Sequence, residues 1–141
     1  AFLANDIMEP DNWLQKKIEA LSYPSAGVVA SSLDCARNNI NNELIISNYL
    51  VPRATIERVG YFAESMFPYG PIDLDYCQRC WAAGLNTYYV MNCLAIHHGN
   101  HATGNEYGWD KEKLVAESWA RHNQEIEGYR TGAMNYYKSR L

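Results

Sequence analysis

Acidic, amide and imidazole side chains stand at the ends of apolar segments of this chain, and their types suit metal binding and base catalysis. They are Asn5, Asp6, Asp73, Asp75, His97 and His98. In α/β sheets, ligands bind at the carboxyl ends of strands. Carboxylate oxygens suit Mg²⁺ or Mn²⁺, and an imidazole ligand tilts the choice toward Mn²⁺. A further carboxylate beside such an ion could act as a general base.

Each of these residues also has a purely structural interpretation. Asp6 could be a turn residue at the end of a strand, and Asp73 could cap a helix. Asp75 and Arg79 are at i and i+4 and could form a solvated ion pair on a helix. His97 could be a hydrogen-bonded histidine of the core. Taken one at a time, the structural interpretation is favoured, so it is their order along the chain that indicates a shared site.

Cysteines offer a competing metal site. Cys77, Cys80, Cys93 and His97 have the spacing C-x2-C-x12-C-x3-H, which lies within the range of structural zinc sites. Two features weigh against zinc: Cys77 and Cys80 fall on one predicted helix, and no turn residues surround Cys93. Cysteines packed as small apolar residues are therefore favoured. A zinc-stapled binding or assembly module stays the alternative.

Strands and helices alternate along the sequence, which predicts an α/β fold with a mixed sheet flanked by helices. Apolar and β-branched runs predict strands over 1–7, 26–31, 44–51 and 85–99, the last as one long strand or two short ones. Helical spacing predicts helices over 11–23, 53–60, 73–84 and 109–129, and a helical tail over 130–141. The Asn-rich stretch 32–43 predicts a surface loop.

The predicted helix over 11–23 has a clear apolar side. Its apolar residues recur at helical spacing and are Trp13, Leu14, Ile18 and Leu21. Lys16 and Lys17 fall off this side. Because an amphipathic helix turns its apolar side to the core, we expect both lysines to face solvent.

Composition limits the classes of function. At 141 residues the chain has the length of one domain. Its net charge of -4 argues against a nucleic-acid surface, which needs clustered lysine and arginine. No apolar run reaches the roughly 18 residues of a membrane span. Because 4 cysteines are too few for a disulfide scaffold, we expect reduced thiols and a cytoplasmic protein, with peripheral membrane association as an alternative.

Four stretches carry a set of features in a fixed order. The first is an acidic motif before a proline and a tryptophan-containing helix, and the second is a strand leading into a short helix. The third is an acidic motif opening a helix, and the fourth is a strand ending in histidine. They are FLANDIMEPDNWLQKKIEAL, LIISNYLVPRATIERVGYFAESMF, YGPIDLDYCQRCWAAGL and TYYVMNCLAIHHGNH. In this order, from Phe2 to His101, they resemble family 2 glycosyltransferases of the GT-A fold. The resemblance implies a partial GT-A domain, with 1–106 as its metal and acceptor side and 107–141 as a helical extension. It also implies a nucleotide-binding half that precedes this chain or comes from another chain.

The resemblance implies a role for each matching residue. Asp6 and His97 would bind Mn²⁺ or Mg²⁺, and Asn5 together with Asp6 would bind the nucleotide-sugar donor. Asp73 would be the general base. The acceptor contacts would come from Tyr69, Asp75, Arg79 and Trp81. The implied reaction is an inverting, metal-dependent sugar transfer to a hydroxyl of a saccharide, a lipid-linked acceptor or a protein.

The sequence departs from the family pattern at two positions. Ala4 stands where the family often has the first acid or amide of the metal motif. Ile72 stands where a further acid usually precedes the base. These departures keep a third possibility, a degenerate transferase fold with a structural role, beside the transferase and the zinc module.

Overall fold

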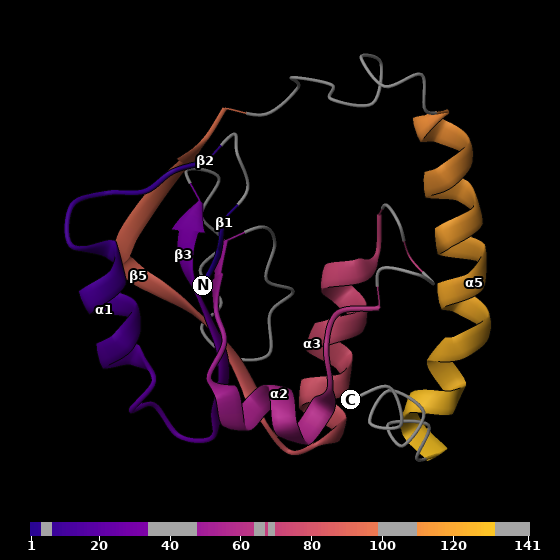
Figure 1. Ribbon diagram of the computed structural model, residues 1–141, viewed down its shortest axis with the longest axis horizontal. Coiled ribbons are helices and arrows are strands. Elements are labelled where there is room, and N and C mark those ends of the chain that lie inside the picture. Colours follow the sequence, from indigo (N-terminus) through magenta and orange to yellow (C-terminus); the bar gives the residue numbers. More distant parts are fainter. Residues whose placement is uncertain (4–6, 34–47, 64–66, 68–69, 99–109, 132–141) are drawn as a thin grey trace.

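The computed structural model describes residues 1–3, 7–33, 48–63, 67, 70–98 and 110–131 (Figure 1). Its strands are β1 (Phe2–Leu3), β2 (Ile7–Met8), β3 (Ala26–Leu33), β4 (Asn48–Leu50) and β5 (Asn86–His97). Its helices are α1 (Trp13–Ala20), α2 (Arg53–Val59), α3 (Ile72–Ala82) and α5 (Lys111–Thr131), and none of them is long and apolar enough to span a membrane. The loop and the tail predicted from the sequence lie mostly outside the described residues.

The described strands form one mixed five-stranded sheet in the order β1-β4-β3-β5-β2. β3 and β5 are parallel, with Val29 beside Tyr88, and every other pair is antiparallel. β5 is one continuous strand, although its register with β3 shifts between Ser31 and Ser32. The mixed α/β class predicted from the sequence is therefore confirmed.

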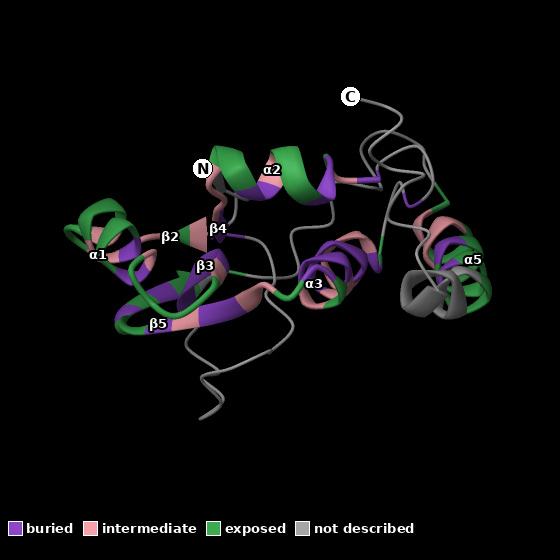
Figure 2. Ribbon diagram, turned by 90° about the horizontal axis from the view of Figure 1, so that it is seen from below, coloured by how far each residue is buried: buried purple, intermediate pink, exposed green. Residues whose placement is uncertain are grey.

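Helices cover both faces of this sheet (Figure 2). On one face, α2 and α3 pack over an apolar cluster that contains Val28 and Cys80. On the other face, α1 packs over a second cluster that contains Val29 and Tyr88. Neighbouring residues of a strand point to opposite faces, which is why Val28 and Val29 belong to different clusters.

α5 packs against α3 on the side away from the sheet, as Figures 1 and 2 show. His122 of α5 is buried and hydrogen-bonds with Gln78 of α3 at 2.9 Å. Its ring also meets Phe67 edge-on, with centroids 5.9 Å apart. Desolvation lowers the pKa of His122, so the imidazole at this helix contact is neutral at pH 7.

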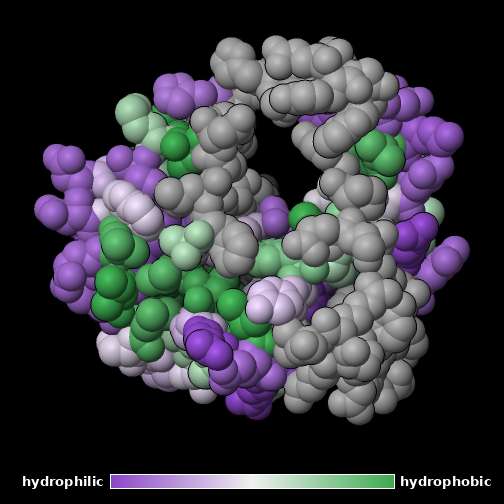
Figure 3. All heavy atoms as spheres, in the orientation of Figure 1, coloured by the Kyte–Doolittle hydropathy of each residue, from purple (hydrophilic) through white to green (hydrophobic). Residues whose placement is uncertain are grey.

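α1 turns a lysine toward the sheet, and the prediction that Lys17 faces solvent is wrong. The Lys17 side chain is 0% exposed, whereas Leu14 and Ile18 are 43% and 49% exposed. The reason lies outside the helix, because the Lys17 ammonium meets the Glu9 carboxylate and the carbonyl of Asn48. These partners offset the cost of burying its charge. Apolar side chains accordingly gather on the surface between α1 and α2 (Figure 3).

The first apolar run forms two short strands where the sequence predicted one. β1 pairs with β4, where Leu3 lies beside Asn48. β2 pairs with β5, where Ile7 lies beside His97. Because β1 and β2 stand at the two ends of the strand order, this one run supplies both edges of the sheet. Residues 4–6, which join the two strands, lie outside the described residues.

Candidate functional site

Two strand pairs hold the chain on either side of Asp6, the predicted metal ligand. Before it, Leu3 pairs with Asn48 on β4. After it, Ile7 pairs with His97 on β5. Because four residue steps span at most about 14 Å, the two pairs lie within that distance of each other. The fold therefore holds Leu3 and Ile7 near each other and pairs Ile7 with His97, although Ile7 and His97 are far apart in the sequence.

His97, the second predicted metal ligand, lies on β5 beside Ile7, the residue that follows Asp6 in the sequence. Register partners on antiparallel strands lie about 4.5–5.5 Å apart between Cα atoms, and one peptide bond joins Asp6 to Ile7. Ile7, the next residue along the chain from Asp6, therefore lies beside His97. A carboxylate oxygen with an imidazole nitrogen is a donor set that fits Mn²⁺. Asn5, Asp6 and the His97 side chain lie outside the described residues, so their ligation of an ion stays a prediction.

The cysteines of the alternative zinc site are not brought together. Cys77 and Cys80 are buried in the cluster under α3, while Cys93 belongs to the cluster under α1 on the other face of the sheet. Within the part of the chain that the structure describes, no group of three or more His, Cys, Asp or Glu side chains could hold a metal ion. Burial raises the pKa of Cys80 to about 12, and the sulfur of Cys93 lies 3.1 Å from the hydroxyl of Ser31. The three cysteines are therefore small core residues.

Asp73 stands in the first turn of α3 and is half-buried. Burial raises the pKa of its carboxyl, and a hydrogen bond from the Tyr49 side chain opposes part of that rise. The positive amino-terminal end of the helix also favours the ionised form. A carboxylate with a raised pKa is a stronger base than an exposed one. This environment suits the abstraction of a proton from a hydroxyl.

Tyr49 is a functional candidate that the sequence did not reveal. Its ring lies on β4 and stacks on Phe62, with centroids 5.6 Å apart. Phe62 in turn stacks on Tyr76 of α3 at 4.2 Å. This column of rings links Tyr49 on β4 to α3, the helix that carries Asp73. Nothing in the strand pattern marks this tyrosine, because its partners come from two later segments of the chain.

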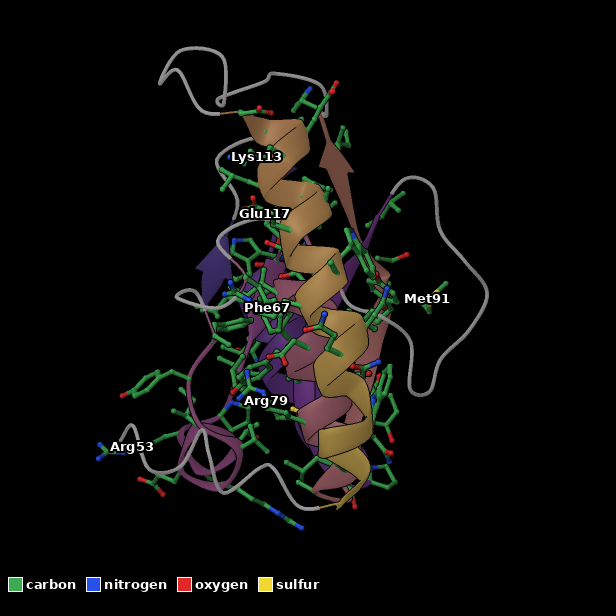
Figure 4. All side chains as sticks on the ribbon, turned by 90° about the vertical axis from the view of Figure 1, so that its right-hand side faces the viewer. Arg53, Phe67, Arg79, Met91, Lys113 and Glu117 are labelled. Atoms are coloured by element: carbon green, nitrogen blue, oxygen red, sulfur yellow. The ribbon has the colours of Figure 1, made fainter. Side chains whose placement is uncertain are left out.

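Asp75 and Arg79 form a buried ion pair, so the interpretation as a solvated pair is wrong. Both side chains are 0% exposed, and Arg79 donates to Asp75 from Nε at 3.0 Å and from Nη2 at 2.8 Å. Its Nη1 donates to the carbonyl of Val59 at 2.7 Å, which ties α3 to the end of α2. Figure 4 shows Arg79 in the interior and Arg53 pointing away from the molecule. With no exposed surface, this pair has none to offer an acceptor, and it acts by holding the helix that carries Asp73.

Trp81, one of the aromatic residues predicted to contact the acceptor, does not lie beside Asp73. It is near the other end of α3, which places it about 12 Å away along the helix axis. Its indole nitrogen donates to the Thr87 hydroxyl at 3.0 Å, and its ring packs against the core. We therefore assign Trp81 to packing. Tyr69, the other predicted aromatic contact, lies outside the described residues.

Comparisons with family models, with curated proteins and with solved structures find no match for this chain. What the chain does must therefore be inferred from its own residues. The residues that bear on it are Asp73 with its partner Tyr49, and the two strand pairs on either side of Asp6.

Tyr49→Phe is expected to move the acidic limb of the pH profile of kcat/KM to higher pH. The substitution removes the hydroxyl that stabilises the Asp73 carboxylate, so the pKa of Asp73 rises further and less base is ionised at acidic pH. On that limb we expect a loss of about tenfold, since a hydrogen bond to a charged group is worth about 1.5 kcal/mol. The plateau at higher pH should change little, because Asp73 is ionised there in both proteins.

Tyr76→Phe is the matched control for this measurement. Tyr76 belongs to the same column of rings, yet its hydroxyl is not among the groups that shift the pKa of Asp73. Its removal should leave the pH profile unchanged. Equal shifts in the two variants would mean that ring packing, and not the hydrogen bond to Asp73, controls the profile.

Proposed function

We propose that this chain is the metal- and acceptor-side part of a GT-A-type glycosyltransferase. It transfers a sugar from a nucleotide-sugar to an acceptor hydroxyl with inversion. One observation carries the proposal: strand pairs flank Asp6 on both sides, and one of them is formed with His97. This pairing supports the proposal because the residue that follows Asp6 lies beside His97, although the two are far apart in the sequence.

Asp73 acts as the base of the proposed reaction. Its carboxylate accepts the proton of the acceptor hydroxyl as that oxygen attacks the sugar. Tyr49 opposes part of the rise in the pKa of Asp73 that burial causes, and the buried pair of Asp75 and Arg79 holds α3 in place. An ion held by Asp6 and His97 would supply charge stabilisation for the departing nucleoside diphosphate. Base and metal together need no covalent intermediate, which is consistent with inversion.

Metal binding by the purified chain tests this proposal. We expect Mn²⁺ to bind in the presence of UDP or GDP, as followed by electron paramagnetic resonance of the free ion. Asp6→Ala and His97→Ala should each weaken this binding by at least about tenfold, because even the loss of an outer partner of a metal ligand costs about 10- to 100-fold. Both variants should keep the circular dichroism of the unaltered chain, so that weaker binding reports the loss of a ligand and not the loss of the fold.

His98→Ala is the control for the metal measurement. His98 follows the end of β5 and is exposed. Its side chain is the same imidazole as that of His97. If Mn²⁺ bound non-specifically to either histidine, His97→Ala and His98→Ala would weaken the binding equally. Loss of binding in His98→Ala but not in His97→Ala would contradict the assignment of His97.

A degenerate transferase with a structural role is a second candidate, and one observation favours it. Ile72 occupies the position of the expected acid and packs against Ala63 and Phe67. An apolar contact has therefore taken the place of a group that would help orient an acceptor. Mn²⁺-dependent nucleotide binding without any sugar transfer or nucleotide-sugar hydrolysis would favour this candidate over the enzyme.

A further inference from the structure

α5 is held to the rest of the fold through polar side chains. Among the described side chains of this helix, Ser118 and His122 are the buried ones, at 2% and 1% exposed. They are four residues apart and therefore lie on the same side of the helix. Within the part of the chain that the structure describes, the buried hydroxyl of Ser118 has no hydrogen-bond partner. Such an interface gains less from apolar burial than one built on leucine, and the unpaired hydroxyl costs free energy. α5 can therefore leave the fold at a lower cost than a helix whose buried side is apolar.

His122 makes the specific contacts of this interface. Its Nε2 lies 2.9 Å from Oε1 of Gln78 on α3, and the ring donates this hydrogen bond because an amide oxygen can only accept. The ring also meets Phe67 and Trp119 edge-on, with centroids 5.9 Å and 5.6 Å apart. The Trp119 indole lies over Gly70, just before α3, with its nitrogen 3.5 Å from the place that a Cβ on Gly70 would occupy. One imidazole therefore joins α5 to α3 and to the segment ahead of it.

The surroundings of His122 favour its uncharged form. Desolvation lowers the pKa of the imidazole, while the charge of Asp75 and a hydrogen bond with Asn123 oppose part of that change. Asp75 is the charged group that acts on the ring from α3, and its carboxylate is already paired with Arg79. From the other segment that packs on His122, the contact is the uncharged ring of Phe67. A proton is therefore bound less tightly by His122 in the docked helix than in a helix released into water.

We propose that His122 is a pH-sensitive switch, which holds α5 on α3 while its imidazole is neutral and releases the helix when it is protonated. Release uncovers Gln78 and Phe67, which lie under α5, so acid exposes a surface of α3 that is covered at neutral pH. The inference does not depend on the proposed function, because His122 is neither the proposed base nor a predicted metal ligand.

Acid favours the released helix. The ordinary pKa of histidine is 6.5, and that of His122 in the docked helix is lower. Well above pH 6.5 both forms are neutral, so this group does not affect release. Each pH unit below that value favours release by up to about tenfold, which gives up to about 30-fold between pH 7.5 and pH 5.0. The dependence ends below the pKa of the docked form, because both forms are then protonated.

Amide hydrogen exchange of the unaltered chain at pH 7.5 and pH 5.0 measures this release, after correction for the intrinsic exchange rate at each pH. A helix that has lost its packing partner is marginal in water, so its amides exchange when it is released. We expect protection over 111–124 to fall by about 5- to 30-fold at pH 5.0. The amides of β5 should then remain at least about tenfold better protected than those of α5, since the sheet stays folded when the helix leaves.

Two variants of the interface test the role of the proton. His122→Gln cannot titrate but keeps a neutral N–H that can reach Gln78, so protection over 111–124 should differ by less than about twofold between the two pH values. Gln78→Glu places a carboxylate opposite the imidazole, which favours the imidazolium and should keep α5 protected at pH 5.0. His98→Gln is the matched control, because His98 is exposed and lies after β5. It should keep the full acid sensitivity of the unaltered chain.

Either of two results overturns the switch. The first is the same acid-induced loss of protection in His122→Gln as in the unaltered chain. The second is equal protection of α5 and β5 at pH 5.0, because the helix then leaves only when the whole chain unfolds. Should His122→Gln fail to fold, Gln78→Glu decides: protection at pH 5.0 no higher than that of the unaltered chain contradicts the role of His122.

Discussion

Asp73→Asn is expected to lower kcat by about 10²- to 10⁴-fold, the contribution usual for a general base. The amide keeps the shape of the side chain but cannot accept the proton of an acceptor hydroxyl. KM for the nucleotide-sugar should change little, because the donor is held by other residues in the proposed site. The measurement is initial-rate kinetics of the full-length protein with a saccharide or lipid-linked acceptor. Near-full transfer activity would contradict the assignment of Asp73.

The same variant should be more stable than the unaltered protein above about pH 4. A loss of kcat together with a gain in stability makes the prediction specific. Burial raises the pKa of Asp73 in the folded chain, so the folded state binds its proton more tightly than the unfolded state does. Stability is therefore lost as the pH rises from the pKa of Asp73 in the unfolded chain through its pKa in the folded chain. Asparagine does not titrate, so the variant does not lose this stability. Urea unfolding at pH 7 and at pH 3 tests this, and the gain should be absent at pH 3. An equal gain in stability at both pH values would mean that burial does not raise the pKa of the Asp73 carboxyl.

Lys17→Met is expected to destabilise the fold by about 3–5 kcal/mol, which is the largest stability effect expected of the substitutions considered for this chain. The reason is that the Glu9 carboxylate, 7% exposed, would stay buried without its cation. Addition of Glu9→Gln should return more than half of the loss. The measurement is urea unfolding at neutral pH, analysed as a double-mutant cycle.

Lys16→Met is the matched control for this prediction. Lys16 is the neighbouring lysine of the same helix, and its ammonium donates to the exposed carbonyl of Asn92 at 2.7 Å. Loss of one exposed hydrogen bond should change the free energy of unfolding by about 1 kcal/mol or less. A larger effect at Lys16 than at Lys17 would contradict the importance assigned to the buried pair.

The helices and most strands could be predicted from periodicity, because apolar spacing and terminal glycines are local signals. α2 is followed by Gly60 and α3 by Gly84, and both glycines have positive φ, 87° and 72°. The pairing of Asp75 with Arg79 could also be predicted, since i and i+4 residues meet on a helix. Its burial could not, because the Val59 carbonyl that completes it comes from another helix.

The environment of the candidate site could not be predicted for the same reason, because it depends on residues that are distant in the sequence. The orientation of Lys17 depends on Glu9 and on a strand that follows much later in the chain. The pKa of Asp73 depends on its burial and on Tyr49, which pattern alone assigns to an ordinary strand position. The zinc spacing was misleading because Cys93 points to the opposite face of the sheet from Cys77 and Cys80. Spacing along the chain does not reveal on which side of a sheet a side chain will lie.

The pairing of β2 with β5 also has a consequence for the order in which the protein assembles. Contacts between residues distant in the chain form late, because the loop between them must first be closed. Ile7 leaves the ribosome long before His97, its register partner. The amino-terminal edge of the sheet must therefore wait, unpaired on that side, until almost all of the described strands have been synthesised. A nascent chain halted before β5 therefore lacks both the strand with which β2 pairs and part of the surface on which α1 packs.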